Sequence, residues 1–321
     1  MFPFNSKPLA RLCAVTFALL VLSACIRPGA NEFAVYQASF NQSYQVGQSV
    51  LDKLAVAERK AFENGRAPIT PRTVYFDPDE ARYLAPGIDP PATASLRKSL
   101  DILNTYTQTV SGLATGESAT TLANRLTQIG TQATSLGARV VAPVGPGQRA
   151  VIDSLATRAQ PLRALEPATT AAFGVLTRAE FQKTVVEQAP TIDAIFDKLI
   201  ALTGTTAAPG AGGKISTDPK RACFEAATTS IFCVLIGDLL FDRDTISGLR
   251  GFSQAEVARI EGLQVLLANW VVLLENTRIA LAQSVDAIEN RQSRANSASI
   301  LQTIAEMDAA AQGVRAALAA Q

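Results

Sequence analysis

Apolar residues recur at steps of three and four residues through most of the chain after residue 32, a spacing that is typical of amphipathic helices. The first stripe runs from Phe33 to about Phe62 and ends at Asn64-Gly65, a sequence that commonly terminates helices. Further stripes follow in 96–110, 122–140, 151–165, 167–202, 219–241, 253–290 and 300–318. Only Thr73 to Phe76 has the character of a strand. The pattern predicts an all-α protein.

Two segments interrupt the helical pattern. Residues 66–92 are rich in proline, which excludes a continuous helix there. Residues 203–217, TGTTAAPGAGGKIST, have the composition of a flexible linker. This linker separates a helical region, 33–202, from a C-terminal helical region, 218–321. We expect the second region to pack on the first. Because short links favour antiparallel neighbours, we predict an antiparallel helical bundle, either elongated or built as two coupled bundles, with one long proline-rich connection.

The N-terminus has the features of an export signal. Lys7 and Arg11 give it a basic start, and Leu12 to Leu22 form an apolar stretch that is too short to span a bilayer, which needs about 20 apolar residues. The quartet Leu22-Ser23-Ala24-Cys25 at the end of this stretch resembles the lipobox of bacterial lipoproteins. An ordinary secretory signal with an incidental cysteine is the alternative.

The resemblance implies a lipid anchor. In bacterial lipoproteins the cysteine thiol carries a diacylglyceryl group, the preceding peptide is removed, and the new amino end is usually acylated, with palmitate as a typical label. Carried over, residues 1–24 are a signal peptide, Cys25 bears the covalent lipid, and residues 25–32 form the tether. Several acyl chains hold a protein stably on a membrane. Ile26 stands where an inner-membrane retention signal has aspartate, which implies an outer-membrane anchor with the body in the periplasm.

The remaining cysteines pose a question of pairing. Cys13 leaves with the signal peptide and Cys25 takes the lipid, so Cys223 and Cys233 are left. An exported pair is usually oxidised to a disulfide. Ten residues of straight helix, however, separate two Cα atoms by about 15 Å, and a disulfide needs roughly 7 Å or less. Either the backbone turns between the two cysteines, or both are buried thiols.

Composition and charge argue against several classes of function. The chain has no histidine, a net charge of +1 and no basic cluster, so nothing indicates nucleic-acid binding. The glycine-rich run 210–216 lacks the spacing of a phosphate-binding loop. Asp238, Asp242 and Asp244 lie near Arg243 and Arg250, which favours a neutralised helix end over a metal site. We therefore expect no enzyme activity, no metal, and no cofactor other than the lipid.

Two apolar tracts, 231–241 and 263–274, allow three interpretations. Neither approaches the length of a membrane span, and polar residues interrupt both, so we expect the lipid to be the sole anchor. Core helices explain the tracts, but the same residues could line a pocket for an apolar ligand. The sequence favours a tethered interaction or scaffold protein with an unknown protein partner. A membrane-perturbing helical protein and a carrier of an apolar ligand are the alternatives.

The proline-rich loop carries aromatic residues that disorder does not explain. Tyr75, Phe76 and Tyr83 lie near the acidic residues 77, 79 and 80, and aromatic side chains with polar tips recur at contact surfaces. One hypothesis is that the three aromatics form a partner-binding face. The other is that they fold back and cover the core of the bundle.

Overall fold

The computed structural model describes residues 30–65, 80–136, 146–165, 177–204, 231–235, 253–290 and 297–320. These residues form helices and contain no strand, so the predicted all-α class is confirmed. The elements are α2 (Ala30–Gly65), α3 (Ala81–Leu84), α4 (Pro91–Thr115), α5 (Ala119–Ser135), α6 (Pro146–Arg158), the 3-10 helix η2 (Gln160–Leu165), α7 (Arg178–Thr203), α9 (Ile231–Leu235), α11 (Gln254–Asn290) and α12 (Ser297–Ala319). The strand-like tract 73–76 lies outside the described residues.

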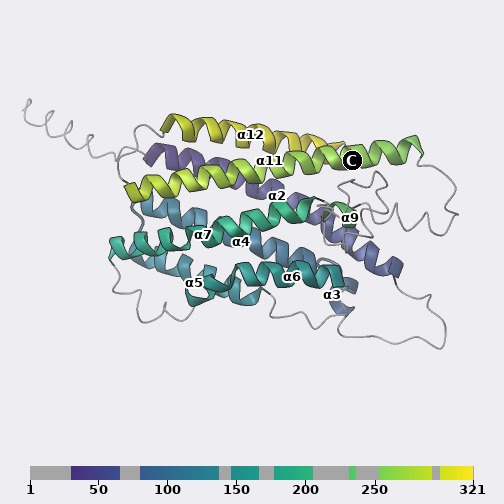
Figure 1. Cartoon of the computed structure of the whole chain (residues 1–321), viewed down its shortest axis with the longest axis horizontal. Coiled ribbons are helices and arrows are strands. Elements are labelled where there is room, and N and C mark those ends of the chain that lie inside the picture. The colour runs from purple at the N-terminus through teal and green to yellow at the C-terminus, as the bar shows by residue number, and fades with distance from the viewer. Residues whose placement is uncertain are drawn as a thin grey trace, which may run out of the picture.

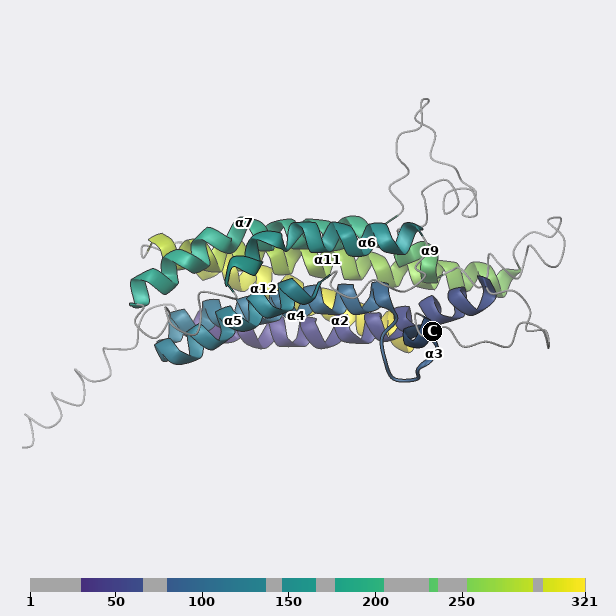
Figure 2. The same ribbon diagram turned by 90° about the horizontal axis from the view of Figure 1, so that it is seen from below.

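The long helices run side by side along one axis and form an elongated bundle (Figures 1 and 2). Helices α2 and α4 run in opposite directions, as do α11 and α12, which matches the predicted antiparallel packing, whereas α2 and α12 are neighbours that run in the same direction (Figure 1). One continuous hydrophobic core includes residues of α2, α4, α5, α7, α11 and α12. Helices on both sides of the predicted linker 203–217 therefore share a single core.

Helix α4 has buried residues along most of its length and contacts α2, α5, α6, α7 and α11. Its buried face includes many serines and threonines, whose hydroxyls would be costly to bury without partners. Ser95, Ser99 and Thr109 solve this problem by donating to the carbonyl four residues earlier, at 3.1, 3.0 and 2.8 Å. The Tyr106 hydroxyl donates to the Val185 carbonyl of α7 at 2.8 Å. Local bonding thus lets a polar sequence occupy the centre of the bundle.

Prolines act on α6 and α7 in different ways. Helix α6 ends at Arg158 and Pro161 lies in η2, so the predicted break at Pro161 is confirmed. The prediction that Pro190 divides its helix is wrong, because α7 continues through it from Arg178 to Thr203. Packing of the buried residues on both sides of Pro190 into the common core compensates for the hydrogen bond that the proline cannot donate.

Helix α11 is the longest described helix, and its start matches the prediction. Ser253 and Glu256 form the predicted capping box, with the Ser253 N–H donating to Glu256 Oε2 at 2.6 Å and the Glu256 N–H donating to Ser253 Oγ at 3.3 Å. By length and composition, residues 254–289 are also apolar enough to cross a membrane. The expectation that no stretch after the signal peptide reaches this length was wrong for α11, because the sequence reasoning considered only the shorter apolar tracts 231–241 and 263–274.

Close packing of α2 on α11 depends on a glycine. A Cβ atom added at Gly47 would lie 2.8 Å from Cη2 of Trp270 and 3.0 Å from Cδ1 of Leu100. Trp270 itself is buried. The absent side chain therefore provides the space that the indole ring fills.

Candidate binding groove

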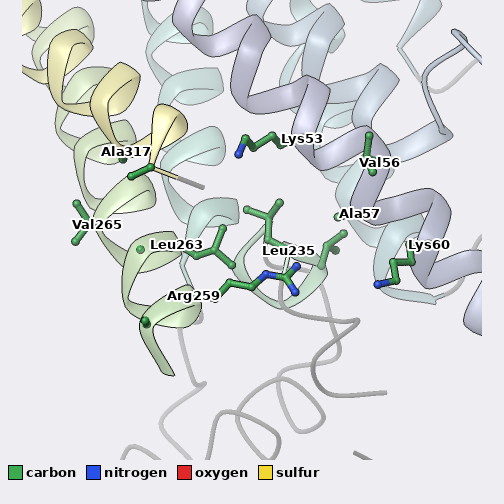
Figure 3. A pocket seen from close by; sticks show the side chains of 13 residues that line it. Lys53, Val56, Ala57, Lys60, Leu235, Arg259, Leu263, Val265 and Ala317 are labelled. Carbon is green, nitrogen blue, oxygen red and sulfur yellow. The ribbon is translucent and has the colours of Figure 1, made fainter. Parts of the chain in front are cut away.

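An open groove of about 810 Å³ lies near one end of the bundle, where α2, α9, α11 and α12 meet. Its walls come from segments that are far apart in the chain, and Figure 3 shows most of them in close view. The lining residues are Lys53, Val56, Ala57, Lys60, Val234, Leu235, Ala258, Arg259, Gly262, Leu263, Val265, Ala317 and Ala320.

Helical periodicity explains why these residues line the groove. On α2 they stand at positions 53, 56, 57 and 60, the spacing of a single helix face. On α11 the positions 258, 262 and 265, with 259 and 263, follow the same rule. Each of these helices thus contributes one face, and α9 closes the space between them (Figure 3).

The charged residues among the described lining of the groove are Lys53, Lys60 and Arg259. Lys53 and Lys60 extend from α2 and Arg259 from α11 toward the space between the two helices (Figure 3). None of the described residues that line the groove is acidic. Each of these three cations also takes part in an interaction within the protein, so the groove combines charged groups that have partners with a mainly apolar lining.

Apolar side chains form the rest of the groove. Leu235 and Leu263 are buried, whereas Val56 on α2 and Val265 at the outer edge on α11 are 64% and 55% exposed (Figure 3). Gly262 widens the groove, because a Cβ atom there would meet nothing within 4 Å. An open space with a mainly apolar lining of this kind is typical of small-molecule sites.

The predicted disulfide involves the short helix that closes the groove. Cys233 of α9 is buried and disulfide-bonded. The other three cysteines lie outside the described residues, so its pairing with Cys223 stays a prediction, as does lipidation at Cys25.

Only Tyr83 of the three loop aromatics lies among the described residues, and it is buried. Its ring stacks on Phe62 with centroids 4.1 Å apart, packs with Ile152, and its hydroxyl donates to Gln148 Oε1 at 3.2 Å. Burial raises the pKa of this phenol. Tyr83 thus packs in a small cluster of its own, apart from the main core, and does not lie on an exposed face. Tyr75 and Phe76 lie outside the described residues, so the proposed face as a whole stays a prediction.

Sequence reasoning missed a buried carboxylate, Glu58, which is 1% exposed. It accepts hydrogen bonds from the N–H groups of Ala92 and Thr93 at 3.1 and 2.9 Å and from Thr93 Oγ1 at 2.7 Å. Burial raises its pKa, and the nearby Asp89 adds to this, while the donors act in the opposite direction. Pro90 precedes α4, and its side chain makes no capping bond. A proline at this position was the one sequence signal that the cap of α4 must come from elsewhere in the chain. Glu58 thus caps α4 from another helix.

A second surface feature lies on the outer side of α11. Val265, Val272 and Ile279 follow one another at seven-residue steps and are 55%, 45% and 47% exposed. The adjacent row on the same helix also has seven-residue steps and consists of exposed Glu261, Ala268, Glu275 and Ala282. Together these two rows form a surface that we call the α11 outer face.

No group of three or more potential ligand side chains suited to a metal ion occurs among the described residues, and Asp238, Asp242 and Asp244 lie outside them. Comparison of the chain with protein-family models, with curated proteins and with solved structures finds no match.

Proposed function

We propose that this protein is a non-enzymatic interaction protein of the bacterial envelope, anchored by lipid at Cys25 in the outer membrane with its helical body in the periplasm. The lipobox-like quartet before Cys25 supports the anchor. The observation that carries the interaction role is the α11 outer face, where Val265, Val272 and Ile279 lie exposed in one row. Large exposed apolar side chains in a continuous row are typical of surfaces that bind a partner.

The spacing of the row indicates the shape of the partner. A seven-residue repeat keeps apolar side chains along one line of a helix, and this is the pattern that a second helix meets in nearly parallel packing. A flat protein surface would not require such a repeat. The partner element that suits the α11 outer face is therefore a helix with its own seven-residue apolar row.

The charges beside the row indicate the chemistry of that helix. Glu261 and Glu275 alternate with Ala268 and Ala282 in the adjacent row. Small alanines permit close approach, and the two carboxylates favour lysine or arginine on the approaching helix. The same carboxylates disfavour insertion of this face into a bilayer, where a buried acid is costly. A basic amphipathic helix of an envelope protein is therefore the proposed partner.

A photoreactive amino acid at position 268 in living cells tests this proposal. We expect a covalent adduct whose attachment site maps to a basic helical segment. Val272→Lys should reduce the adduct at least tenfold, because it removes an apolar contact and repels the basic helix. Val35→Lys is the matched control, since Val35 is a similarly exposed valine on α2 (46%). It should leave the adduct unchanged.

Two results would overturn the proposal. One is an adduct that persists in Val272→Lys, and the other is adduct formation only with lipid. The second result would favour the membrane-perturbing alternative, which also predicts that the chain from residue 26 onward releases dye from liposomes. We expect no release, because much of the apolar side of α11 is occupied by the core of the bundle.

A further inference from the structure

We infer that the basic partner helix lies over the seam between α11 and α12 and contacts both helices, so that α12 supplies half of its binding surface. The inference rests on the proposed function, because it concerns the same partner. The surface, which we call the α11–α12 seam, combines an exposed row on each helix. The rows are Val265, Val272 and Ile279 on α11 and Gln302, Ala309 and Ala316 on α12.

Two contacts determine the register of α11 and α12, which run side by side (Figure 1). Gln283 Nε2 donates to Ser299 Oγ at 2.9 Å. Gly313 packs so closely on Asn269 that an added Cβ atom would clash with the side-chain oxygen of Asn269. Position 283 is therefore level with 299, and position 269 is level with 313. A step forward on α11 is thus a step back on α12.

This register brings the two exposed rows together. Position 272 is level with 310, and Ala309 is the exposed residue next to it. The rows pair across the seam as Val265 with Ala316, Val272 with Ala309 and Ile279 with Gln302. Both rows have seven-residue steps, so they stay together along the bundle. An amphipathic helix placed over the seam would therefore contact two helices at once, as a helix does in a groove.

Small side chains on α12 leave room for such a helix. The distance between two packed helices is about 8–10 Å and depends on the side chains at the contact. Ala309 and Ala316 are exposed and end at Cβ, whereas Gln302 is longer and donates to Glu306 Oε1 at 3.2 Å. The closest approach is therefore expected at Ala309 and Ala316, beside the two valines.

The exposed charges beside the seam are acidic. Glu261 and Glu275 on α11 and Glu306 on α12 are all exposed. Carboxylates on both helices favour lysine and arginine on the helix that approaches them. They disfavour a second copy of this chain that presents the same seam, because like charges would then meet.

The basic residues of α11 and α12 do not offset these acids at the seam. In the described parts of the two helices they are Arg259, Arg278 and Arg315. Arg278 forms ion pairs with two aspartates of α7, and Arg315 donates to Gln42 Oε1 of α2 at 3.3 Å. Arg259 lines the groove and has an interaction partner within the protein. The cations are thus held at other sides of the two helices, and the seam keeps its acidic character.

A photoreactive amino acid at position 309 of the full chain in living cells tests the inference. We expect an adduct whose attachment site lies in the same basic helical segment that position 268 reaches. Position 150 is the matched control site, because Ala150 is an exposed alanine inside α6. It should give no adduct with that segment.

Substitutions of Ala309 separate the effects of size and charge on the adduct formed from position 268. Ala309→Ser keeps a small side chain and should leave the adduct unchanged. Ala309→Gln adds length without charge and should reduce the adduct about threefold, whereas Ala309→Lys also repels a basic helix and should reduce it about tenfold or more. Ala150→Lys is the control and should change nothing. Because position 309 is exposed, every variant should keep the thermal midpoint of the parent, which circular dichroism measures.

The outcomes distinguish the seam from the α11 outer face. An adduct from position 268 that Ala309→Lys does not reduce, or that has no counterpart from position 309, would overturn the seam and leave the α11 outer face in place. The absence of an adduct from both positions would overturn both. An adduct from position 309 with lipid, with a second copy of this chain or with a segment that lacks basic residues would also overturn the inference.

Discussion

Replacing Glu58 with alanine tests whether a carboxylate from α2 holds the start of α4. Glu58 is 1% exposed and accepts three hydrogen bonds, two from backbone N–H groups and one from the Thr93 hydroxyl. Glu58→Ala leaves these donors without their acceptor in a buried region, at about 1–3 kcal/mol for each group that finds no new partner. It also removes the cost of burying a carboxylate. We expect a net loss of about 2–4 kcal/mol in the free energy of unfolding.

Two milder variants divide this loss into parts. Thr93→Val removes only the hydroxyl bond of 2.7 Å and should cost about 1 kcal/mol. Glu58→Gln keeps one acceptor oxygen but turns an amide NH₂ toward the backbone donors, so about 1–2 kcal/mol should be lost. Urea unfolding followed by circular dichroism measures all three. A Glu58→Ala midpoint equal to that of the parent would refute the capping role.

The pH dependence provides a second check on Glu58. Burial raises its pKa in the folded state, so the folded protein holds this proton more tightly than the unfolded chain does. The resulting stabilisation is complete below the ordinary glutamate pKa of about 4.3 and is lost as pH rises through the folded pKa. The parent should therefore lose stability relative to Glu58→Gln as pH increases from about 4 to about 7. A relative gain would show that the donors outweigh burial.

Three further predictions concern packing, anchoring and pairing. Gly47→Ala should lower the free energy of unfolding by about 1–2 kcal/mol, because the added methyl group meets a buried indole ring. Gly262→Ala has open space at its Cβ and should raise the free energy of unfolding by up to about 1 kcal/mol. Cys25→Ser should abolish palmitate labelling and release the protein into the soluble fraction; persistent labelling would exclude the lipoprotein hypothesis. Thiols of protein from the periplasm can be blocked under denaturing conditions before and after reduction. We expect Cys223 and Cys233 to react only after reduction, because they are bonded. Two thiols that react without reduction would exclude the bridge.

The sequence was sufficient for the helices because periodicity is a local property. The capping box at Ser253 and Glu256 was predicted correctly from four residues. Thr177 and Glu180 form a similar box that the sequence reasoning missed. Pro190 was misjudged because its effect depends on the packing of α7, which involves other helices.

Sites built from distant segments could not be predicted in the same way. Glu58 meets Ala92 and Thr93, more than 30 residues along the chain, and nothing in the local pattern joins them. The groove requires four helices, and its lining residues appear in the sequence as parts of separate stripes. Apolar periodicity showed which residues face inward or outward in one helix, but not where two helices leave a space between them.

The direction of α2 determines how far the groove can stand from a membrane. If Cys25 carries the lipid, only residues 26–29 separate it from α2, so Ala30 is kept within roughly 17 Å of the anchored cysteine. Lys53 lies 23 residues further along α2, and a helix rises 1.5 Å per residue. When the axis of the bundle is perpendicular to the membrane, Lys53 is therefore about 35 Å further from the membrane than Ala30. The groove would then lie clear of the bilayer surface. The length of α2 would then set the distance between the membrane and the far end of the bundle.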